Sequence, residues 1–131
     1  MSRRTSIEVK GLEHVNPIPN ASRIGPFVVS GGIFGKDPAT GKFPEGIDAQ
    51  CQQMFANVRT VLEAAGASPE DVIKMSFWLR DMTNRPQVNK YWVEMFPDAH
   101  SRPARHTFPT PDLRAPLEIE CEIMAVISGK E

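Results

Sequence analysis

The sequence is poor in cysteine, with two in 131 residues, Cys51 and Cys121. Two cysteines are too few for the disulfide framework that holds small secreted domains together. Each falls on an apolar face of a predicted element, so we expect buried free thiols. This cysteine usage fits a reducing, cytoplasmic compartment.

The sequence also lacks a long apolar run and an excess of charge of either sign. No stretch approaches the roughly 20 apolar residues of a membrane-spanning helix. The basic start, Met1–Thr5, does not lead into the apolar core of a signal peptide. A net charge of −1 gives no electrostatic case for binding nucleic acid or an anionic membrane. We therefore predict a cytoplasmic protein without nucleic-acid or membrane partners.

Motifs for nucleotides, metals and serine hydrolases are absent as well. The glycines at 31, 32 and 35 form neither G-x-G-x-x-G nor a P-loop. His14, His100 and His106 are scattered without metal-ligand spacing, so no metal site is predicted. Ser30 precedes two glycines but lacks the G-x-S-x-G pattern of a nucleophile elbow.

The hydrophobic pattern that is present predicts one α+β domain spanning residues 1–131. Apolar residues at three- and four-residue spacing predict a helix over Gly46–Ala65. A second helix is expected after Asn84, which suits an N-cap, and before Pro97. Strands are expected at 5–10, 27–30, 72–80, 105–108 and 117–127. The order predicts one mixed sheet with two helices packed on one face.

Alternation along two strands defines the two faces of this sheet. Ile73, Met75, Phe77 and Leu79 are expected to face the helices. In 117–127, every second residue is apolar, and the other face combines three glutamates with Met124 and Val126. Such a half-apolar face suggests a partner surface, most simply another copy of the chain. The alternative is a solvated face with a few stray apolar residues.

The segment Ser101–Thr107, with the strand that follows it, supplies the candidate catalytic groups. Arg105 suits a bidentate carboxylate clamp, although a surface or ion-paired arginine is the alternative. Glu120 is either a solvated face charge or, if covered, a carboxyl with a raised pKa that can act as a general acid. A guanidinium held near a carboxylate would bind an organic acid and move protons beside it.

An ordered set of segments resembles the RidA/YjgF/UK114 family, the reactive-intermediate imine deaminases, over essentially the whole chain. The segments are 29–33, 37–41, 57–66, 71–74, 88–89, 102–105 and 120–122. The resemblance implies a chorismate-mutase-like fold and a homotrimer with sites in the clefts between subunits. It further implies hydrolysis of 2-imino and enamine acids, such as species derived from 2-aminoacrylate, to 2-oxo acids and ammonia, without a cofactor.

By the same resemblance, Arg105 binds the substrate carboxylate with help from the backbone N–H of Gly31. Glu120 orients the attacking water or carries a proton to the departing nitrogen. The other implied substrate-binding positions are Ser30, Ile18, Thr107 and Asn89. Three residues depart from the family's usual pattern: Ile18 replaces a tyrosine, Gly32 a glutamine and Thr107 a cysteine.

These departures leave other functions open. One is a non-catalytic trimer that binds a small carboxylate or another protein. Another is a deaminase specialised for a catabolic enamine. Some family members carry an endoribonuclease label, but the net charge of −1 and the lack of a basic stripe argue against a ribonuclease here.

Overall fold

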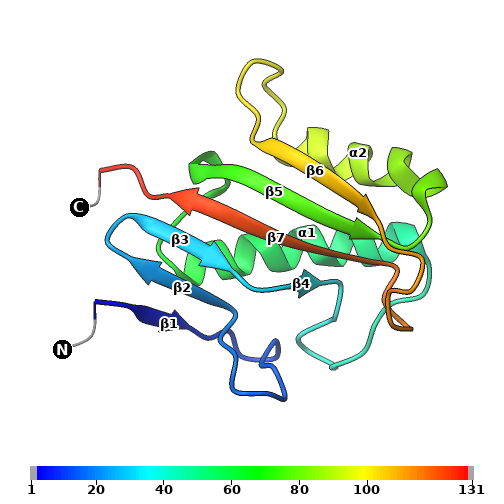
Figure 1. Ribbon diagram of the computed structural model, residues 1–131, viewed down its shortest axis with the longest axis horizontal. Coiled ribbons are helices and arrows are strands. Elements are labelled where there is room, and N and C mark those ends of the chain that lie inside the picture. The colour runs from blue at the N-terminus through cyan, green and yellow to red at the C-terminus, as the bar shows by residue number, and fades with distance from the viewer. Residues whose placement is uncertain (1–2, 130–131) are drawn as a thin grey trace.

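The computed structural model describes residues 3–129 and consists of one twisted sheet and two helices (Figure 1). The strands are β1 (Thr5–Ile7), β2 (Ala21–Ile24), β3 (Phe27–Ser30), β4 (Ile33–Phe34), β5 (Val72–Leu79), β6 (Ala104–Pro109) and β7 (Ile119–Val126). The helices are α1 (Ile47–Ala64) and α2 (Arg85–Met95). A short 3₁₀ turn, η1 (Pro69–Asp71), follows α1, and a second, η2 (Met82–Asn84), precedes α2.

The sheet is mixed, as the sequence predicts. Its strand order is β1-β2-β3-β7-β5-β6, and β4 pairs with the other end of β7. The β5–β6 pair is parallel, whereas the remaining pairs are antiparallel. Parallel neighbours need a crossover connection, and α2 provides it between β5 and β6. This crossover places α2 beside the edge strand β6, where the candidate arginine lies.

Both helices cover the same face of the sheet. The Phe77 ring on β5 lies 5.8 Å from the Phe55 ring of α1 and 6.1 Å from the Trp92 ring of α2. The two helices lie on the far side of the strands in Figure 1. The predicted layer of two helices on one sheet face is therefore confirmed.

Helix α1 buries the stripe that its periodicity predicts. Cys51, Met54, Val58 and Leu62 are fully buried on its inner side, and Gly66 follows the helix with a φ of 83° that favours glycine. Both cysteines are buried and free, as expected. Burial raises the pKa of Cys51 to about 12, so this thiol stays protonated and unreactive at neutral pH.

Helix α2 begins where expected, but Asn84 does not cap it through its side chain. The cap lies one turn earlier, where the Asp81 carboxylate accepts hydrogen bonds from the backbone N–H of Thr83, at 2.9 Å, and from its hydroxyl, at 2.7 Å. Asn84 is already part of the η2 turn, so its backbone does not have the extended geometry of a usual N-cap.

The prediction that Ile73 faces the helices is wrong. The β5–β7 register shifts between Val72 and Lys74, and such a bulge re-aims the side chains on either side of it. Ile73 is consequently 56% exposed, while Val72 is buried in the core. Strands β2 and β4 were not predicted, so the expected order of five strands is also incomplete.

The face opposite the helices is partly apolar. Val29 pairs with Met124 and Phe27 with Val126, and Phe27, Val29 and Met124 are 61%, 47% and 44% exposed. Glu120 lies on this open face of the sheet, because it occupies the same alternating positions of β7 as Met124. Within residues 3–129, no helix has the length and apolar character needed to cross a membrane.

Candidate functional site

Arg105 lies on the edge strand β6, and two hydrogen bonds hold its side chain on the helix-covered side of the sheet. Its Nε donates to Oγ1 of Thr107 at 3.0 Å, and its Nη1 donates to Oδ1 of Asn89 at 2.8 Å. Thr107 follows two positions along β6, so it shares a face with Arg105. Asn89 comes from α2. Strand and helix together therefore fix the direction of the guanidinium.

The guanidinium also lies over two aromatic rings of the core. Its Cζ is 5.1 Å from the centroid of Phe77 and 5.2 Å from that of Trp92. Arginine stacks well on aromatic faces, which restricts its motion further. A preorganised guanidinium loses less conformational freedom when it binds a ligand.

Arg105 is half-buried, yet no aspartate or glutamate within residues 3–129 forms an ion pair with it. Burial lowers the pKa of Arg105, and the positive charge of Arg85 lowers it further. An arginine nevertheless stays charged. Its two hydrogen bonds use two of five N–H groups, so three remain for an anion. A half-buried guanidinium with free N–H groups and no acidic partner can bind a carboxylate through charge-assisted hydrogen bonds.

Glu120 lies on the open face of β7 beside two aromatic residues. Its neighbours across the strands are Trp78 on β5 and Phe34 on β4, and the Trp78 ring stacks on that of Phe108 at 5.6 Å. Burial raises the pKa of Glu120, and the negative charge of Glu122 raises it further. A carboxyl with a raised pKa can hold and release a proton nearer to neutral pH.

Gly32 makes room for the Glu120 carboxylate. A Cβ atom at position 32 would overlap Oε2 of Glu120. The family's usual glutamine could therefore not occupy this position unless the glutamate moved. The glycine at position 32 thus leaves the space that the Glu120 carboxylate occupies.

Arg105 and Glu120 do not lie together in a single chain. The Arg105 side chain contacts Asn89 on α2 and Phe77, which packs under both helices. Glu120 faces the other way. The expected guanidinium beside a carboxylate is thus not formed within one copy, and a site that used both groups would need a second copy of the chain.

Ser30 and Gly31 already have partners within the chain. The Ser30 hydroxyl accepts from the backbone N–H of Ile123 at 2.9 Å and donates to the Gly31 carbonyl at 2.8 Å. The Gly31 N–H donates to the Asn20 carbonyl at 3.0 Å. In this conformation both residues join β3 to its neighbours. Ile18 is 48% exposed, in the loop that precedes β2.

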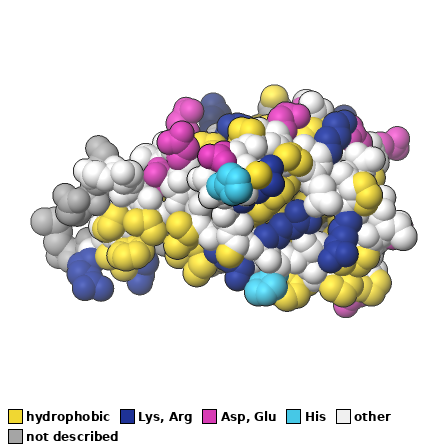
Figure 2. Space-filling model, turned by 90° about the horizontal axis from the view of Figure 1, so that it is seen from above, with side chains coloured by type: hydrophobic (Ala, Val, Ile, Leu, Met, Phe, Trp, Pro, Cys, Tyr) yellow, Lys and Arg dark blue, Asp and Glu magenta, His cyan; other side chains and the backbone are white. Residues whose placement is uncertain are grey.

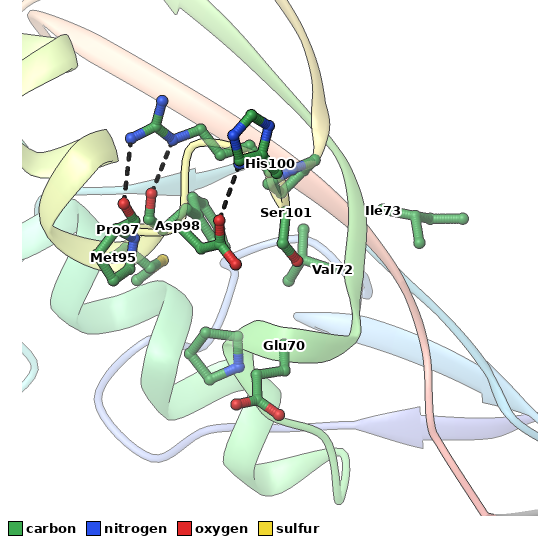
Figure 3. A pocket seen from close by; sticks show the side chains of 12 residues that line it. Glu70, Val72, Ile73, Met95, Pro97, Asp98, His100 and Ser101 are labelled. Carbon is green, nitrogen blue, oxygen red and sulfur yellow. Dashed lines mark hydrogen bonds between the residues drawn. The ribbon is translucent and has the colours of Figure 1, made fainter.

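A larger hollow of about 680 Å³ lies between η1, the start of β5 and the loop after α2 (Figure 3). Its polar groups mainly satisfy the backbone of that loop. Nε of Arg102 donates to the carbonyl of Phe96 at 2.8 Å, and the Asp98 carboxylate accepts from the backbone N–H of His100 at 2.9 Å. The Arg102 side chain therefore caps the C-terminal end of helix α2, whereas Arg105, three residues later, keeps N–H groups free for a ligand.

A groove of about 540 Å³ surrounds Arg105 and includes a residue that sequence reasoning missed. Arg85, Asn89, Arg105, His106 and Thr107 line this groove. The signal for Arg85 was its position four residues before Asn89, on the same face of a helix. Within the described residues, no group of three or more histidine, cysteine, aspartate or glutamate side chains could hold a metal ion.

Comparisons with known proteins connect this geometry to one family. The family model described as Endoribonuclease L-PSP matches residues 10–127. A RutC family protein of Aquifex aeolicus is 34% identical over 112 residues, which cover 86% of this chain and 90% of that protein. The 2-iminobutanoate/2-iminopropanoate deaminase of Salmonella typhimurium is 29% identical, with 86% and 88% covered.

A solved structure agrees with these sequence matches. The crystal structure of RidA from an Antarctic Psychrobacter is similar to this chain with a TM-score of 0.87. The two are 30% identical, and the similarity covers 94% of this chain and 99% of the other. The chain therefore belongs to the Rid family, whose sequence model carries the description Endoribonuclease L-PSP.

Proposed function

We propose that the chain hydrolyses 2-imino and enamine acids to 2-oxo acids and ammonia, at a site formed between copies of the chain. The observation that carries the proposal is the half-buried Arg105 guanidinium, which Asn89 and Thr107 orient and no acidic side chain in residues 3–129 neutralises. Relatives named as 2-iminobutanoate/2-iminopropanoate deaminases support the reaction class.

Arg105 would hold the substrate carboxylate. Its fixed, planar N–H groups suit bidentate hydrogen bonds to two carboxylate oxygens. This contact places the adjacent C2 carbon, the electrophilic centre of the imine, at a defined distance from the guanidinium. Holding the imine beside an ordered water supplies much of the rate enhancement, because the reaction no longer depends on a chance encounter.

The reaction itself needs one water and the transfer of protons. An enamine first takes a proton on carbon and loses one from nitrogen to become the imine. Water then adds through its oxygen to C2, and a proton reaches the nitrogen, which gives a tetrahedral carbinolamine. The nitrogen takes a second proton, the C–N bond breaks with its electron pair on nitrogen, and the hydroxyl loses its proton, so a 2-oxo acid and ammonia are formed. No electrons are exchanged with an outside reagent.

Glu120 would move these protons. Because burial raises its pKa, the carboxyl can protonate the departing nitrogen and, once ionised, accept a proton from the attacking water. A positioned acid or base of this kind contributes about 10²–10⁴-fold to the rate. Gly32 leaves the space in which this carboxyl sits.

The two groups would meet across an interface between copies of the chain. Arg105 and Glu120 lie on opposite faces of one sheet, so one copy would contribute the guanidinium and the next would contribute the carboxyl. The exposed Phe27, Val29 and Met124 give the open face an apolar surface that another copy can bury. A homotrimer, the assembly expected from the family resemblance, closes such head-to-tail contacts into a ring.

The test is to add purified protein to freshly generated 2-aminoacrylate and to follow the appearance of the 2-oxo acid. We expect acceleration by the wild type and by Arg59→Ala, a control at an exposed arginine on α1. Arg105→Ala should give no acceleration. Equal acceleration by Arg105→Ala would show that the site is wrong.

Two further results would decide between the alternatives. Carboxylate binding through Arg105 without turnover of any imine or enamine acid would favour the non-catalytic binding protein. A monomer at micromolar concentration in sedimentation would contradict a site made from two chains.

A further inference from the structure

The groove at Arg105 contains a second guanidinium for which the proposed reaction has no use. Arg85 lines this groove with Asn89, Arg105 and Thr107. A simple 2-imino acid has one carboxylate, and Arg105 suffices to bind it. Figure 2 looks onto the α2–β6 side of the molecule, where lysine and arginine side chains gather.

The position of Arg85 directs it toward the same ligand. Arg85 is the first residue of α2, and Asn89 follows four positions later, so the two side chains lie on one face of the helix, with Cβ atoms about 5–6 Å apart. Asn89 in turn holds Nη1 of Arg105. Arg85 therefore lies about one helical turn from Asn89, which orients Arg105. The positive charge of Arg85 is also close enough to lower the pKa of Arg105.

Helix stability does not explain an arginine at this position. Cations are disfavoured in the first turn of a helix, where the backbone N–H groups already present positive charge. The first turn of α2 contains no acidic residue that would offset this effect. No aspartate or glutamate in residues 3–129 forms an ion pair with Arg85. Two unneutralised guanidiniums in one groove repel each other until a ligand brings negative charge.

We infer that the groove selects dicarboxylic substrates, namely 2-imino or enamine acids whose side chain carries a second carboxylate. Arg105 holds the carboxylate next to the reacting carbon, and Arg85 holds the distal one. This inference rests on the proposed function for the nature of the reacting group, but the charge selection itself can be measured without turnover. A monocarboxylic acid of the same length would leave Arg85 without a partner.

The experiment uses two stable 2-oxo acids of equal chain length, 2-oxoglutarate with two carboxylates and 2-oxopentanoate with one. Their affinities for the wild type, Arg85→Gln and Arg59→Gln are measured by calorimetry at one fixed ionic strength. A hydrogen-bonded charge pair predicts that the wild type binds 2-oxoglutarate about 10- to 100-fold more tightly than 2-oxopentanoate. Arg85→Gln should bring this ratio close to one, and the control Arg59→Gln should keep it.

Two results would overturn the inference: a ratio near one in the wild type, or an unchanged ratio in Arg85→Gln. Circular dichroism of each variant excludes unfolding as the cause, and Arg85 is exposed, so its replacement should leave the fold intact. An Arg85-dependent preference without any deaminase activity contradicts the proposed function alone. Deamination of 2-aminoacrylate without a preference for 2-oxoglutarate contradicts this inference alone.

Discussion

The side chain of Asn57 ties helix α1 to the strand that lies against Glu120, and its replacement gives the sharpest stability prediction. Its Nδ2 donates to the backbone carbonyls of Phe34 and Lys36, each at 2.8 Å. Its Oδ1 accepts from Nε2 of Gln53 at 2.9 Å. Asn57 is 1% exposed, so water cannot easily replace these bonds.

Asn57→Asp keeps the shape of the side chain but removes both N–H donors. An acceptor oxygen then faces two carbonyl oxygens, which lose their partner. Each unsatisfied group costs about 1–3 kcal/mol, and the two carbonyls belong to partly buried residues, so the lower half of that range applies. We expect the free energy of unfolding to fall by about 3 kcal/mol, a large part of the ~5–15 kcal/mol that is typical of a domain.

The assay is urea unfolding at one fixed protein concentration, because association shifts apparent stability. Gln53→Ala is the matched control on the same helix. It removes the one bond to Oδ1 and leaves both carbonyl contacts in place, so it should cost less than about 1 kcal/mol. A loss of less than about 0.5 kcal/mol for Asn57→Asp would refute the view that this amide anchors β4.

The same change should affect the candidate acid. Phe34 pairs directly with Glu120 across β4 and β7, so loosening the segment around β4 removes one wall of the glutamate's surroundings. We expect Asn57→Asp to lower kcat while the affinity for 2-oxo acids, which depends on the Arg105 groove, stays close to that of the wild type.

Three more substitutions separate the roles of the site residues. Glu120→Gln should lower kcat by about 10²–10⁴-fold. Because folding raises the pKa of Glu120, the folded protein holds a proton that the unfolded chain has lost at pH values between the ordinary and the raised pKa. The stability of the wild type should therefore fall relative to that of the variant as pH rises between these two values, as measured by urea unfolding from pH 4 to 8. Thr107→Val removes the acceptor of the Arg105 Nε and should raise KM about 2- to 10-fold with little change in kcat, whereas an unchanged KM would mean that Asn89 alone orients the guanidinium. Gly32→Ala should fold, because the overlapping atom is the end of the flexible Glu120 side chain, but should lower kcat by about 10²-fold; wild-type kinetics would show that the position of this carboxylate does not matter.

The long elements were predictable because their patterns reflect burial on one side. Helix α1 and strand β7 follow their predicted stripes, and every predicted inner residue of β7 is buried. The exception on β5 is Ile73, which a bulge turns outward. A bulge inserts one residue into the two-residue period, and its position depends on the pairing partner, which alternation within one strand does not reveal.

The short strands β2 and β4 could not be predicted for a different reason. They have four and two residues, too few to show a period. Strand β2 forms a tight hairpin with β3, and β4 pairs with β7, which lies far away in the sequence. Both strands therefore depend on their pairing partners rather than on their own propensity.

The candidate site was predictable residue by residue but not as a geometry. The residue types of Arg105 and Glu120 indicate their chemistry. Their orientation on opposite faces depends on how two strands pair around a third. Arg85 was missed because it becomes a candidate only through the groove that α2 and β6 line together. The sequence alone does not show that α2 lies beside that strand.

The placement of Arg105 and Glu120 on opposite faces of one sheet also has a genetic consequence under the proposed function. Each site would belong to a pair of neighbouring copies rather than to any one of them. Chains that lack the guanidinium and chains that lack the carboxyl would each be inactive alone, yet assemblies containing both would regain some intact sites. Two defective alleles in one cell could then complement each other, and activity would depend on assembly, and so on protein concentration, as well as on the sequence of each chain.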